Sequence, residues 1–326
     1  MGVGQIVAIA SAVAGGKASK LPEGKNTTAS DVDLDITDER GNVLARFAGG
    51  HIITKRFDSS NIINPVRTRI KFAAHNGAYY LAPECTIPAY RIAGQLGYEE
   101  ADVAGIDFST DGTMYVIHDD TVDRTTDGTG YLHDKTDAEI AALNITKTGE
   151  GYDLADFDPA ELKIPTLEQV IQQCVCYDMK MVLRLHAFPN TYDTPENIAV
   201  WDALVNLLKV YNVKTEDIIC YVGTAAMANT CRTLFGNDVT IATFLGQAAT
   251  AQSFIDWFTN GSITGNRAAI IHYINLDLSA VKLLHSNGIQ VYCYGSQSEE
   301  EAANCAVWGV DVFQNSKIHM VTDRYL

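Results

Sequence analysis

From residue 69 to the end of the chain, short apolar runs alternate with longer amphipathic stretches, and this alternation limits the folds open to the chain. In the stretch 194–212, Pro195 marks a helix start and apolar residues such as Trp201, Leu204 and Leu208 share one face. Strand–helix units repeated over about 250 residues predict a (β/α)8 TIM barrel, an α/β fold. The eight candidate strands are 70–74, 103–108, 181–185, 218–222, 240–245, 268–274, 290–294 and 311–314.

An open, doubly wound sheet is the alternative fold for such an alternation. A doubly wound sheet of the nucleotide-binding type has a glycine-rich phosphate loop after an early strand. Neither G-x-G-x-x-G nor G-x-x-x-x-G-K-[ST] occurs in the sequence. The barrel is therefore the predicted fold for residues 69–326.

Residues 1–68 differ in composition and predict a separate, β-rich segment. Alternating apolar residues at 32–36, 43–47 and 51–57 predict three short strands. So small a unit has too little interior to stand alone, and we expect it to pack against other copies of itself. The pattern D-E-x-G-N-V … G-H-I-x-T-K-x-F-D-S resembles adaptor modules of phage and bacterial surface appendages. The resemblance implies a homotrimer through residues 1–68, with a larger particle holding the N-terminus.

The charge balance argues against polyanionic partners. With 24 basic and 40 acidic side chains the formal charge is −16, which argues against binding to nucleic acid or to an anionic membrane surface. The apolar run 6–14 is far shorter than the roughly 20 residues of a membrane span. Because the first basic residue, Lys17, follows this run, we expect neither a signal peptide nor a membrane span. The cellular location stays open, a virion or cell-surface appendage being the setting that the adaptor resemblance implies.

The most specific motif in the chain is the 13-residue segment 118–130, HDDTVDRTTDGTG. Two shorter motifs precede it: His75-Asn76-Gly77 after the first predicted strand, and Pro83-Glu84-Cys85-Thr86. Together they resemble the glycerophosphodiester phosphodiesterase family, over the whole of residues 69–326. The resemblance implies a TIM barrel that cleaves phosphodiesters. It also implies a divalent cation, Mg²⁺ or Ca²⁺, held by a Glu-x-Asp on strand 2 and a Glu on strand 3.

The same resemblance implies the roles of two histidines. His75 and His118 would move protons while a phosphodiester bond is cleaved, a task that suits imidazole near neutral pH. Glu84 and Asn76 lie in the matching motifs and are candidate substrate-binding residues. His272, inside an apolar run, is interpreted as a hydrogen-bonded core histidine.

Several positions depart from the family pattern. Asn76 stands where the family has an arginine, and Arg184-Leu185-His186 stands where it has Glu-x-Lys. The Glu-x-Asp positions fall on Val103 and Gly105 when counted back from Gly112. Counted forward from Gly97 they fall on Asp102 and Ala104. Asp102 and Asp107 remain the candidate metal ligands, and no cofactor is predicted from the residues themselves.

These departures favour a displayed, catalytically eroded barrel on an oligomeric appendage such as a virion fibre. There it would contact a phosphate-bearing or glycan-bearing surface polymer. Two alternatives stay open. One is an active phosphodiesterase with an altered or metal-independent site, in which Arg184 and His186 neutralise the phosphate. The other is a purely structural decoration protein without a ligand.

Overall fold

The fold is described from a computed structural model, which covers residues 34–37, 43–48, 51–54, 70–149, 151–295 and 298–315. The chain divides into two compact units, Met1–Val66 with Thr322–Leu326, and Arg67–Val321. We describe each unit by itself. The first ten residues and most of the predicted adaptor lie outside the described residues, so the predicted trimer contacts stay a prediction.

The described part of the first unit is a three-stranded antiparallel sheet. Its strands are β1 (Leu34–Thr37), β2 (Val43–Ala48) and β3 (His51–Thr54), in the order β1-β2-β3. In the register, Phe47 of β2 pairs with Leu34 of β1 and Ile52 of β3. The three predicted strands are therefore confirmed, although the third ends at Thr54 in the described residues.

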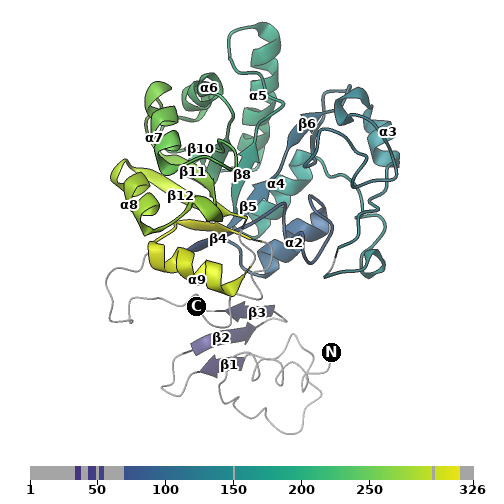
Figure 1. The fold of residues 1–326 in the computed structure, drawn as a ribbon. Coiled ribbons are helices and arrows are strands. Elements are labelled where there is room, and N and C mark those ends of the chain that lie inside the picture. Colours follow the sequence, from purple (N-terminus) through teal and green to yellow (C-terminus); the bar gives the residue numbers. More distant parts are fainter. Residues whose placement is uncertain are drawn as a thin grey trace. The chain divides into compact units, whose positions relative to one another are not determined.

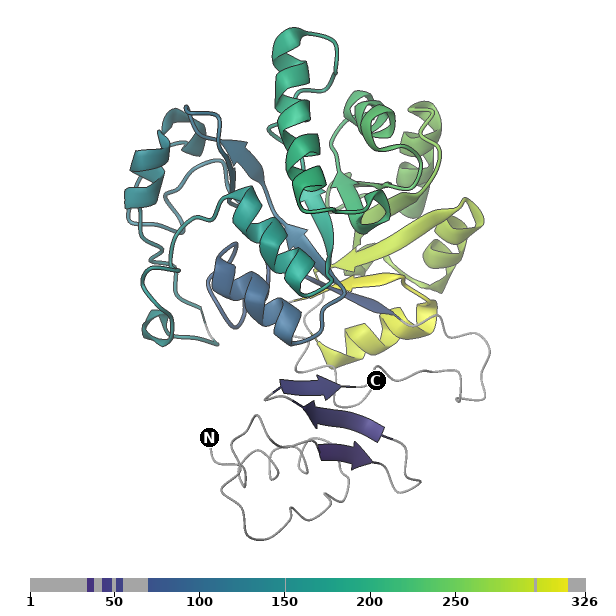
Figure 2. The same cartoon turned by 180° about the vertical axis from the view of Figure 1, so that it is seen from behind.

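The second unit contains a closed barrel of parallel strands, which confirms the predicted (β/α)8 fold (Figures 1 and 2). The order around the barrel is β10-β11-β12-β13-β4-β5-β8-β9. Because closure pairs the last strand with the first, every strand of the barrel has two neighbours and no edge is left open. The strands are β4 (Lys71–Ala74), β5 (Glu100–Val103), β8 (Lys180–Arg184), β9 (Ile218–Tyr221), β10 (Thr240–Thr243), β11 (Arg267–His272), β12 (Ile289–Tyr294) and β13 (Val312–Gln314).

The second barrel strand differs from the prediction. Instead of one strand over 103–108, the chain forms β5 and then β6 (Ile106–Phe108), which leaves the barrel and pairs antiparallel with β7 (Met114–Val116). The break lies at Gly105, which has a φ of +60° and lies so close to Ile117 that an added Cβ would be 2.0 Å from its carbonyl oxygen. Only glycine fits there, since it tolerates both the positive φ and the close backbone approach. Gly105 is the sequence signal of the break, and the strand predicted over 103–108 runs through it.

Helices surround the strands (Figures 1 and 2). Most begin at a Ser, Thr or Asp whose side chain accepts a hydrogen bond from a backbone amide of the first turn, which fixes the point of entry. Such caps are Thr86, Thr166, Thr194, Thr224, Thr250, Asp277 and Ser298. The corresponding helices are α2 (Ile87–Gln95), α4 (Leu167–Cys176), α5 (Pro195–Val210), α6 (Ala225–Phe235), α7 (Ala251–Asn260), α8 (Leu278–Ser286) and α9 (Glu299–Trp308). A short helix, α3 (Asp137–Ala142), follows the β6–β7 hairpin. No helix within the described ranges has both the length and the apolar character to cross a membrane.

The barrel core has two apolar layers, set by the alternation of side chains along each strand. The larger layer lies between strands and helices and includes Phe72, Val103, Leu183 and Trp201. The inner layer is built mostly from small and branched side chains, as expected for a tapering barrel interior. It comprises Ala73, Val182, Ile219, Ala242, Ala268, Ile270, Tyr292 and Val312.

Trp201 provides a test of the packing between α5 and the barrel. Its side chain is fully buried, it packs against Phe188, and its indole N–H donates to the Pro189 carbonyl at 3.1 Å. We expect Trp201→Ala to lower the free energy of unfolding by about 3–5 kcal/mol, because it leaves a cavity. Urea unfolding followed by circular dichroism measures this. Val210→Ala on the same helix is the control, since Val210 is 68% exposed and the change should stay within about 0.5 kcal/mol. Equal effects of the two variants would contradict the packing described.

Candidate active site at the barrel mouth

One side chain from each strand lines the C-terminal end of the barrel. Continuing the inward-facing alternation by one step beyond the inner layer gives one position on each strand. On β5 this position is Asp102, since Val103 belongs to the outer layer. We call this set the mouth ring: His75, Asp102, Arg184, Tyr221, Phe244, His272, Tyr294 and Gln314.

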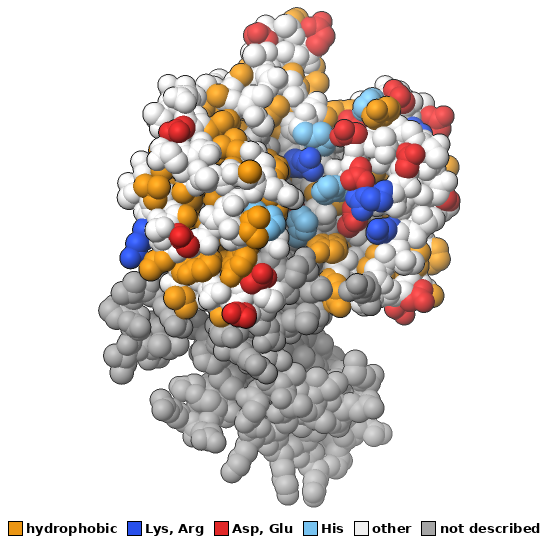
Figure 3. Space-filling model, viewed as in Figure 1, with side chains coloured by type: hydrophobic (Ala, Val, Ile, Leu, Met, Phe, Trp, Pro, Cys, Tyr) orange, Lys and Arg blue, Asp and Glu red, His pale blue; other side chains and the backbone are white. Residues whose placement is uncertain are grey.

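Next to the mouth ring lies a cavity that brings the two predicted catalytic histidines together. Its volume is about 250 Å³, and it opens to solvent. His75 follows β4 directly, whereas His118 comes from the loop after β7, 43 positions later in the chain. The cavity is lined by His75, Asn76, Tyr79, Glu84, His118, Asp119 and Arg124. Histidine and basic side chains gather near the centre of this face of the molecule, with acidic side chains beside them (Figure 3).

A chain of ionic hydrogen bonds fixes His118. Its Nδ1 lies 2.7 Å from Asp119 Oδ1, and Arg124 binds both that carboxylate and the carboxylate of Glu84. The Arg124 hydrogen bond is the main reason why the pKa of Asp119 falls to about 2. Asp119 is thus ionised and holds the imidazole of His118 with Nδ1 towards it, which leaves Nε2 for another partner.

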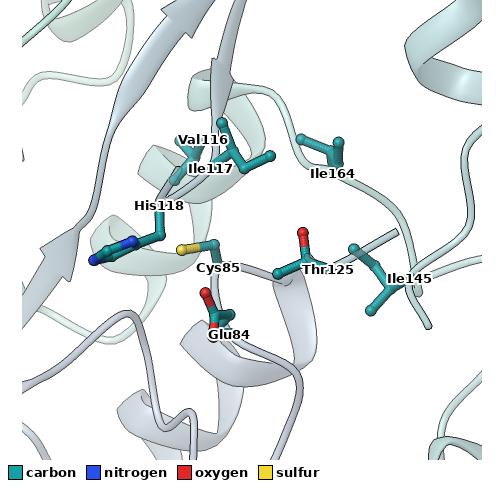
Figure 4. Close-up of a pocket in the computed structure, with 8 residues that line it drawn as sticks. All are labelled: Glu84, Cys85, Val116, Ile117, His118, Thr125, Ile145 and Ile164. Atoms are coloured by element: carbon teal, nitrogen blue, oxygen red, sulfur yellow. The ribbon is translucent and has the colours of Figure 1, made fainter. Parts of the chain in front are cut away.

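Apolar side chains support His118 from behind. A small cavity of about 10 Å³ is lined by His118 together with Cys85, Ile117 and Ile145, and Figure 4 shows Cys85 between His118 and Thr125, with Ile145 beyond Thr125. Cys85 is buried and has a φ of +56°. Burial raises the pKa of its thiol well above the usual value, so it is not a nucleophile at neutral pH.

His75 faces a second carboxylate, Asp102. His75 Nε2 lies 4.0 Å from Asp102 Oδ2, and the same oxygen accepts a hydrogen bond from Gln314 Nε2 at 2.7 Å. Burial is the largest cause of the pKa changes at both groups: it lowers the pKa of His75 and raises that of Asp102, while the charge of each opposes the shift of the other. The pair therefore tends towards neutral His75, the form that accepts a proton.

Arg184 is the next member of the mouth ring beyond Asp102. Its guanidinium lies over the Tyr221 ring, 5.9 Å from the centroid, and no carboxylate of the described residues is within ion-pair distance of it. Its charge nevertheless acts on both His75 and Asp102. His186, two residues on, lies 3.4 Å from Asp120, and burial, followed by the charge of Arg184, lowers its pKa.

The remaining predicted site residues are placed as follows. Asn76 is 5% exposed, and its side-chain oxygen is buried without a hydrogen-bond partner among the described residues. Asp107 lies on β6 outside the barrel, where it bonds to the Phe108 amide and to His133 rather than joining Asp102. Within the described ranges, no three His, Cys, Asp or Glu side chains are grouped so that they could hold a metal ion.

Sequence reasoning misses five of the eight members of the mouth ring. In the sequence pattern Tyr221, Phe244, Tyr294 and Gln314 stand only as strand residues, and His272 is interpreted as a core histidine. In the structure, His272 packs edge-on against Tyr294 at the mouth, with a centroid distance of 4.9 Å. The signal that could have found these residues is the alternation itself, continued past the last buried residue of each strand.

A closed parallel barrel whose candidate functional side chains gather at its C-terminal mouth belongs to the class of (β/α)8 TIM-barrel proteins. The profile of the glycerophosphoryl diester phosphodiesterase family matches residues 75–314. The chain belongs to this family.

Comparison with individual proteins extends this result. The human glycerophosphodiester phosphodiesterase 1 is 40% identical over 113 residues, which are 35% of this chain and 33% of that protein. A glycerophosphodiester phosphodiesterase from Caldanaerobacter subterraneus is 33% identical over 147 residues, 45% of this chain and 55% of that protein. The matches thus span about a third to about half of the length of these curated relatives.

Solved structures share the fold at lower identity. A phosphodiesterase from Oleispira antarctica, solved in complex with the product sn-glycerol-3-phosphate, superposes with a TM-score of 0.61 at 22% identity, covering 78% of this chain and 96% of that one. A glycerophosphodiester phosphodiesterase from Agrobacterium tumefaciens superposes with a TM-score of 0.60 at 19% identity, covering 78% and 99%.

The Arg124 network yields a prediction about stability and pH. Arg124→Ala leaves the carboxylates of Glu84 and Asp119 without their cation, and Glu84 is only 12% exposed. We expect the free energy of unfolding at pH 7 to fall by about 1–3 kcal/mol. Because the pKa of Asp119 is lowered in the folded state, its contribution is full above its ordinary value of 3.8 and is lost as the pH falls towards 2. Urea unfolding at pH 7 and pH 3 should therefore show a smaller difference between wild type and variant at pH 3.

Arg91→Ala is the matched control for this variant. Arg91 forms a bidentate ion pair with Glu161, and both side chains are 34% exposed. Its removal should change the free energy of unfolding by about 1 kcal/mol or less. An Arg124 effect no larger than that of Arg91 would show that the network does not brace the site.

Proposed function

We propose that the barrel is a phosphodiesterase that acts on glycerophosphodiesters, with Arg184 neutralising the phosphate in place of the divalent cation that the family resemblance implies. The observation that carries the proposal is the meeting of His75 and His118 in one cavity, together with Arg184, whose charge acts on His75 and which no described carboxylate pairs. Membership of the family, and the product sn-glycerol-3-phosphate in the complex of the Oleispira phosphodiesterase, support the substrate class.

Phosphate binding follows from the charges around the cavity. A phosphodiester anion resists attack until its oxygens are neutralised, and a guanidinium offers fixed donors to two of them. Arg184 is better suited than Arg124 for this, because Arg124 already binds two carboxylates. The unpaired side-chain oxygen of Asn76 adds an acceptor for a substrate hydroxyl at the cavity wall.

The two histidines have different partners and hence different tasks. Neutral His75 would take the proton from the attacking water as the new P–O bond forms. His118, held at Nδ1 by the ionised Asp119, would give a proton from Nε2 to the alkoxide that leaves as the old P–O bond breaks. The products are a phosphate monoester and an alcohol, and a proton moves from His75 to His118 through solvent before the next turnover.

The carboxylates near the cavity do not fit a divalent cation. Mg²⁺ and Ca²⁺ prefer several oxygen ligands. Glu84 and Asp119 are engaged by Arg124, and Asp102 accepts from Gln314 and stands next to Arg184 in the ring. A guanidinium in the coordination shell would repel the ion. We therefore derive no step through a metal.

Display on a trimeric appendage and binding of a surface polymer remain hypotheses. The adaptor segment that would mediate display lies mostly outside the described residues. An eroded barrel and a purely structural one share the prediction that no diester is cleaved, so an activity measurement separates both from the proposed enzyme.

The first prediction of this proposal is metal-independent activity. Release of sn-glycerol-3-phosphate from a panel of glycerophosphodiesters should proceed equally with EDTA and with millimolar Mg²⁺ or Ca²⁺. Arg184→Gln should lower kcat/KM by about 10²–10³, since it removes the charge that meets the developing oxyanion. His75→Ala and His118→Ala should each lower kcat by at least about 10².

Val210→Ala is the control and should leave the kinetics unchanged, because Val210 ends helix α5 and is 68% exposed. Loss of activity in EDTA that Mg²⁺ or Ca²⁺ restores would show that a metal site exists after all. Absence of cleavage under every condition would leave the eroded or structural barrel as the correct function.

The second prediction concerns pH. Burial lowers the pKa of His75, so the acidic limb of the kcat/KM profile should lie below pH 6.5, the ordinary pKa of histidine. The charge of Asp102 raises the pKa of His75, so Asp102→Asn should move this limb to still lower pH. Steady-state kinetics between pH 4.5 and pH 9 would measure both. A limb that moves to higher pH in Asp102→Asn would contradict the pairing of these two residues.

A further inference from the structure

The mouth ring separates into two contiguous halves of different chemistry. On β13, β4, β5 and β8 it carries polar and charged side chains, Gln314, His75, Asp102 and Arg184. On β9, β10, β11 and β12 it carries aromatic rings, Tyr221, Phe244, His272 and Tyr294. The proposed chemistry uses only the first half, and the second half has no role in it.

Three rings of the aromatic half are in contact and form one surface. Tyr294 meets Phe244 edge to face at a centroid distance of 5.3 Å and His272 at 4.9 Å. Tyr221 joins this half to the charged half, because Arg184 lies over its ring. All four rings are partly exposed, whereas Ile219, Ala242, Ile270 and Tyr292 in the layer below are buried and close the floor.

The two tyrosine hydroxyls of the aromatic half lack partners among the described residues. The Tyr294 hydroxyl is buried and the Tyr221 hydroxyl is not, and neither makes a hydrogen bond to a described residue. His272 Nδ1 accepts from the Ile274 amide at 3.2 Å, so the proton of the neutral ring is on Nε2. A buried hydroxyl without a partner is unfavourable, and a ligand hydroxyl that enters between the rings would relieve it.

On these observations we propose that the aromatic half binds the alcohol portion of the diester, and that this portion is a polyhydroxylated ring, a sugar or a cyclitol. The inference rests on the proposed function for the position of the phosphate. With the phosphate at Arg184, the alcohol beyond it reaches Tyr221 and then the other three rings. Rings that offer apolar faces with hydroxyl tips match a group whose C–H faces are apolar and whose edge carries hydroxyls.

Other alcohols fit this surface less well. A quaternary ammonium such as choline is attracted to aromatic faces, but here the guanidinium of Arg184 already lies on Tyr221 and repels a second cation. No carboxylate belongs to the aromatic half of the ring. An acyl chain gains nothing from the two tyrosine hydroxyls and would leave them unpaired.

The test compares diesters that differ only in the alcohol. The probes are glycerophosphoinositol, a glycerol–phosphate–glucose diester, glycerophosphoethanolamine and glycerophosphocholine. Binding is measured by calorimetry on the His118→Ala protein, so that turnover does not interfere, and kcat/KM is measured on the otherwise native chain. We expect the inositol or the glucose diester, or both, to bind at least about tenfold more tightly than the choline and ethanolamine diesters. Which of the two binds more tightly distinguishes a cyclitol from a sugar.

Conservative variants test which side chains produce the preference for ring-bearing diesters. Tyr221→Phe and Tyr294→Phe keep both rings and remove one oxygen each. Each should weaken binding of the ring-bearing diesters about five- to tenfold and leave the choline and ethanolamine diesters within twofold. Phe244→Ala should act in the same direction by removing the apolar face. Tyr131→Phe, at a tyrosine that is 50% exposed on the neighbouring loop, is the matched control and should change nothing.

The outcomes separate this inference from the proposed function. Ring-selective binding that depends on Tyr221 and Tyr294, without cleavage by the native chain, would support the inference and overturn the catalytic proposal. Cleavage of all four diesters with equal kcat/KM, or equal losses for all four in the variants, would overturn the inference and leave the catalytic proposal standing. Tighter binding of the choline diester, or no binding of any probe, would also overturn it. If Phe244→Ala fails to fold, the two Tyr→Phe variants decide.

Discussion

The alternation of side chains along strands that close on themselves governs this site. Closure means that each of the eight strands must send one residue in two into the barrel interior, and the last inward residue of each strand reaches the mouth. The chemistry at the mouth is thus decided by eight positions far apart in sequence. A charged half and an aromatic half result because like residues occupy neighbouring strands, β13 to β8 on one side and β9 to β12 on the other. The sequence of any single strand does not predict this division into a charged and an aromatic half.

The parts of the structure that depend on local patterns were open to prediction. Apolar runs located seven of the eight barrel strands, and the 118–130 motif with His75 identified the two histidines that share the cavity. The second strand was misplaced because its end depends on Gly105, whose positive φ and contact with Ile117 cannot be read from the glycine alone. The hydrogen bond from Gln314 to Asp102 joins residues 212 positions apart in the sequence, and it follows only from closure of the barrel. For the same reason the sequence left two registers for the strand-2 carboxylates, and the outward-facing Val103 favours the one that uses Asp102.

The loop after β7 is held by another loop rather than by the barrel. Arg124 binds two carboxylates at once, so it fixes the loop that carries His118 to the loop that carries Glu84 without the aid of the barrel strands. The histidine is then positioned by its own loop and not by the residues on β5 and β8. A substitution in the mouth ring, for example at Arg184 at the end of β8, therefore leaves the contacts that hold His118 intact. The site joins a loop that is held by its own ion pairs to side chains at the strand ends.

The guanidinium of Arg184, which no described carboxylate pairs, lies in a chain whose formal charge is −16. An approaching anion therefore meets two opposite fields, a repulsive one from the whole molecule and an attractive one that acts only near the mouth. Salt screens interactions beyond about 8–10 Å at physiological ionic strength and leaves the close contact largely intact. Capture of a small anionic ligand should then become faster as salt is first added, the reverse of the usual behaviour of electrostatically steered association. In a negatively charged molecule with this guanidinium at the mouth, the encounter rate depends on ionic strength in a way that the affinity of the final contact does not.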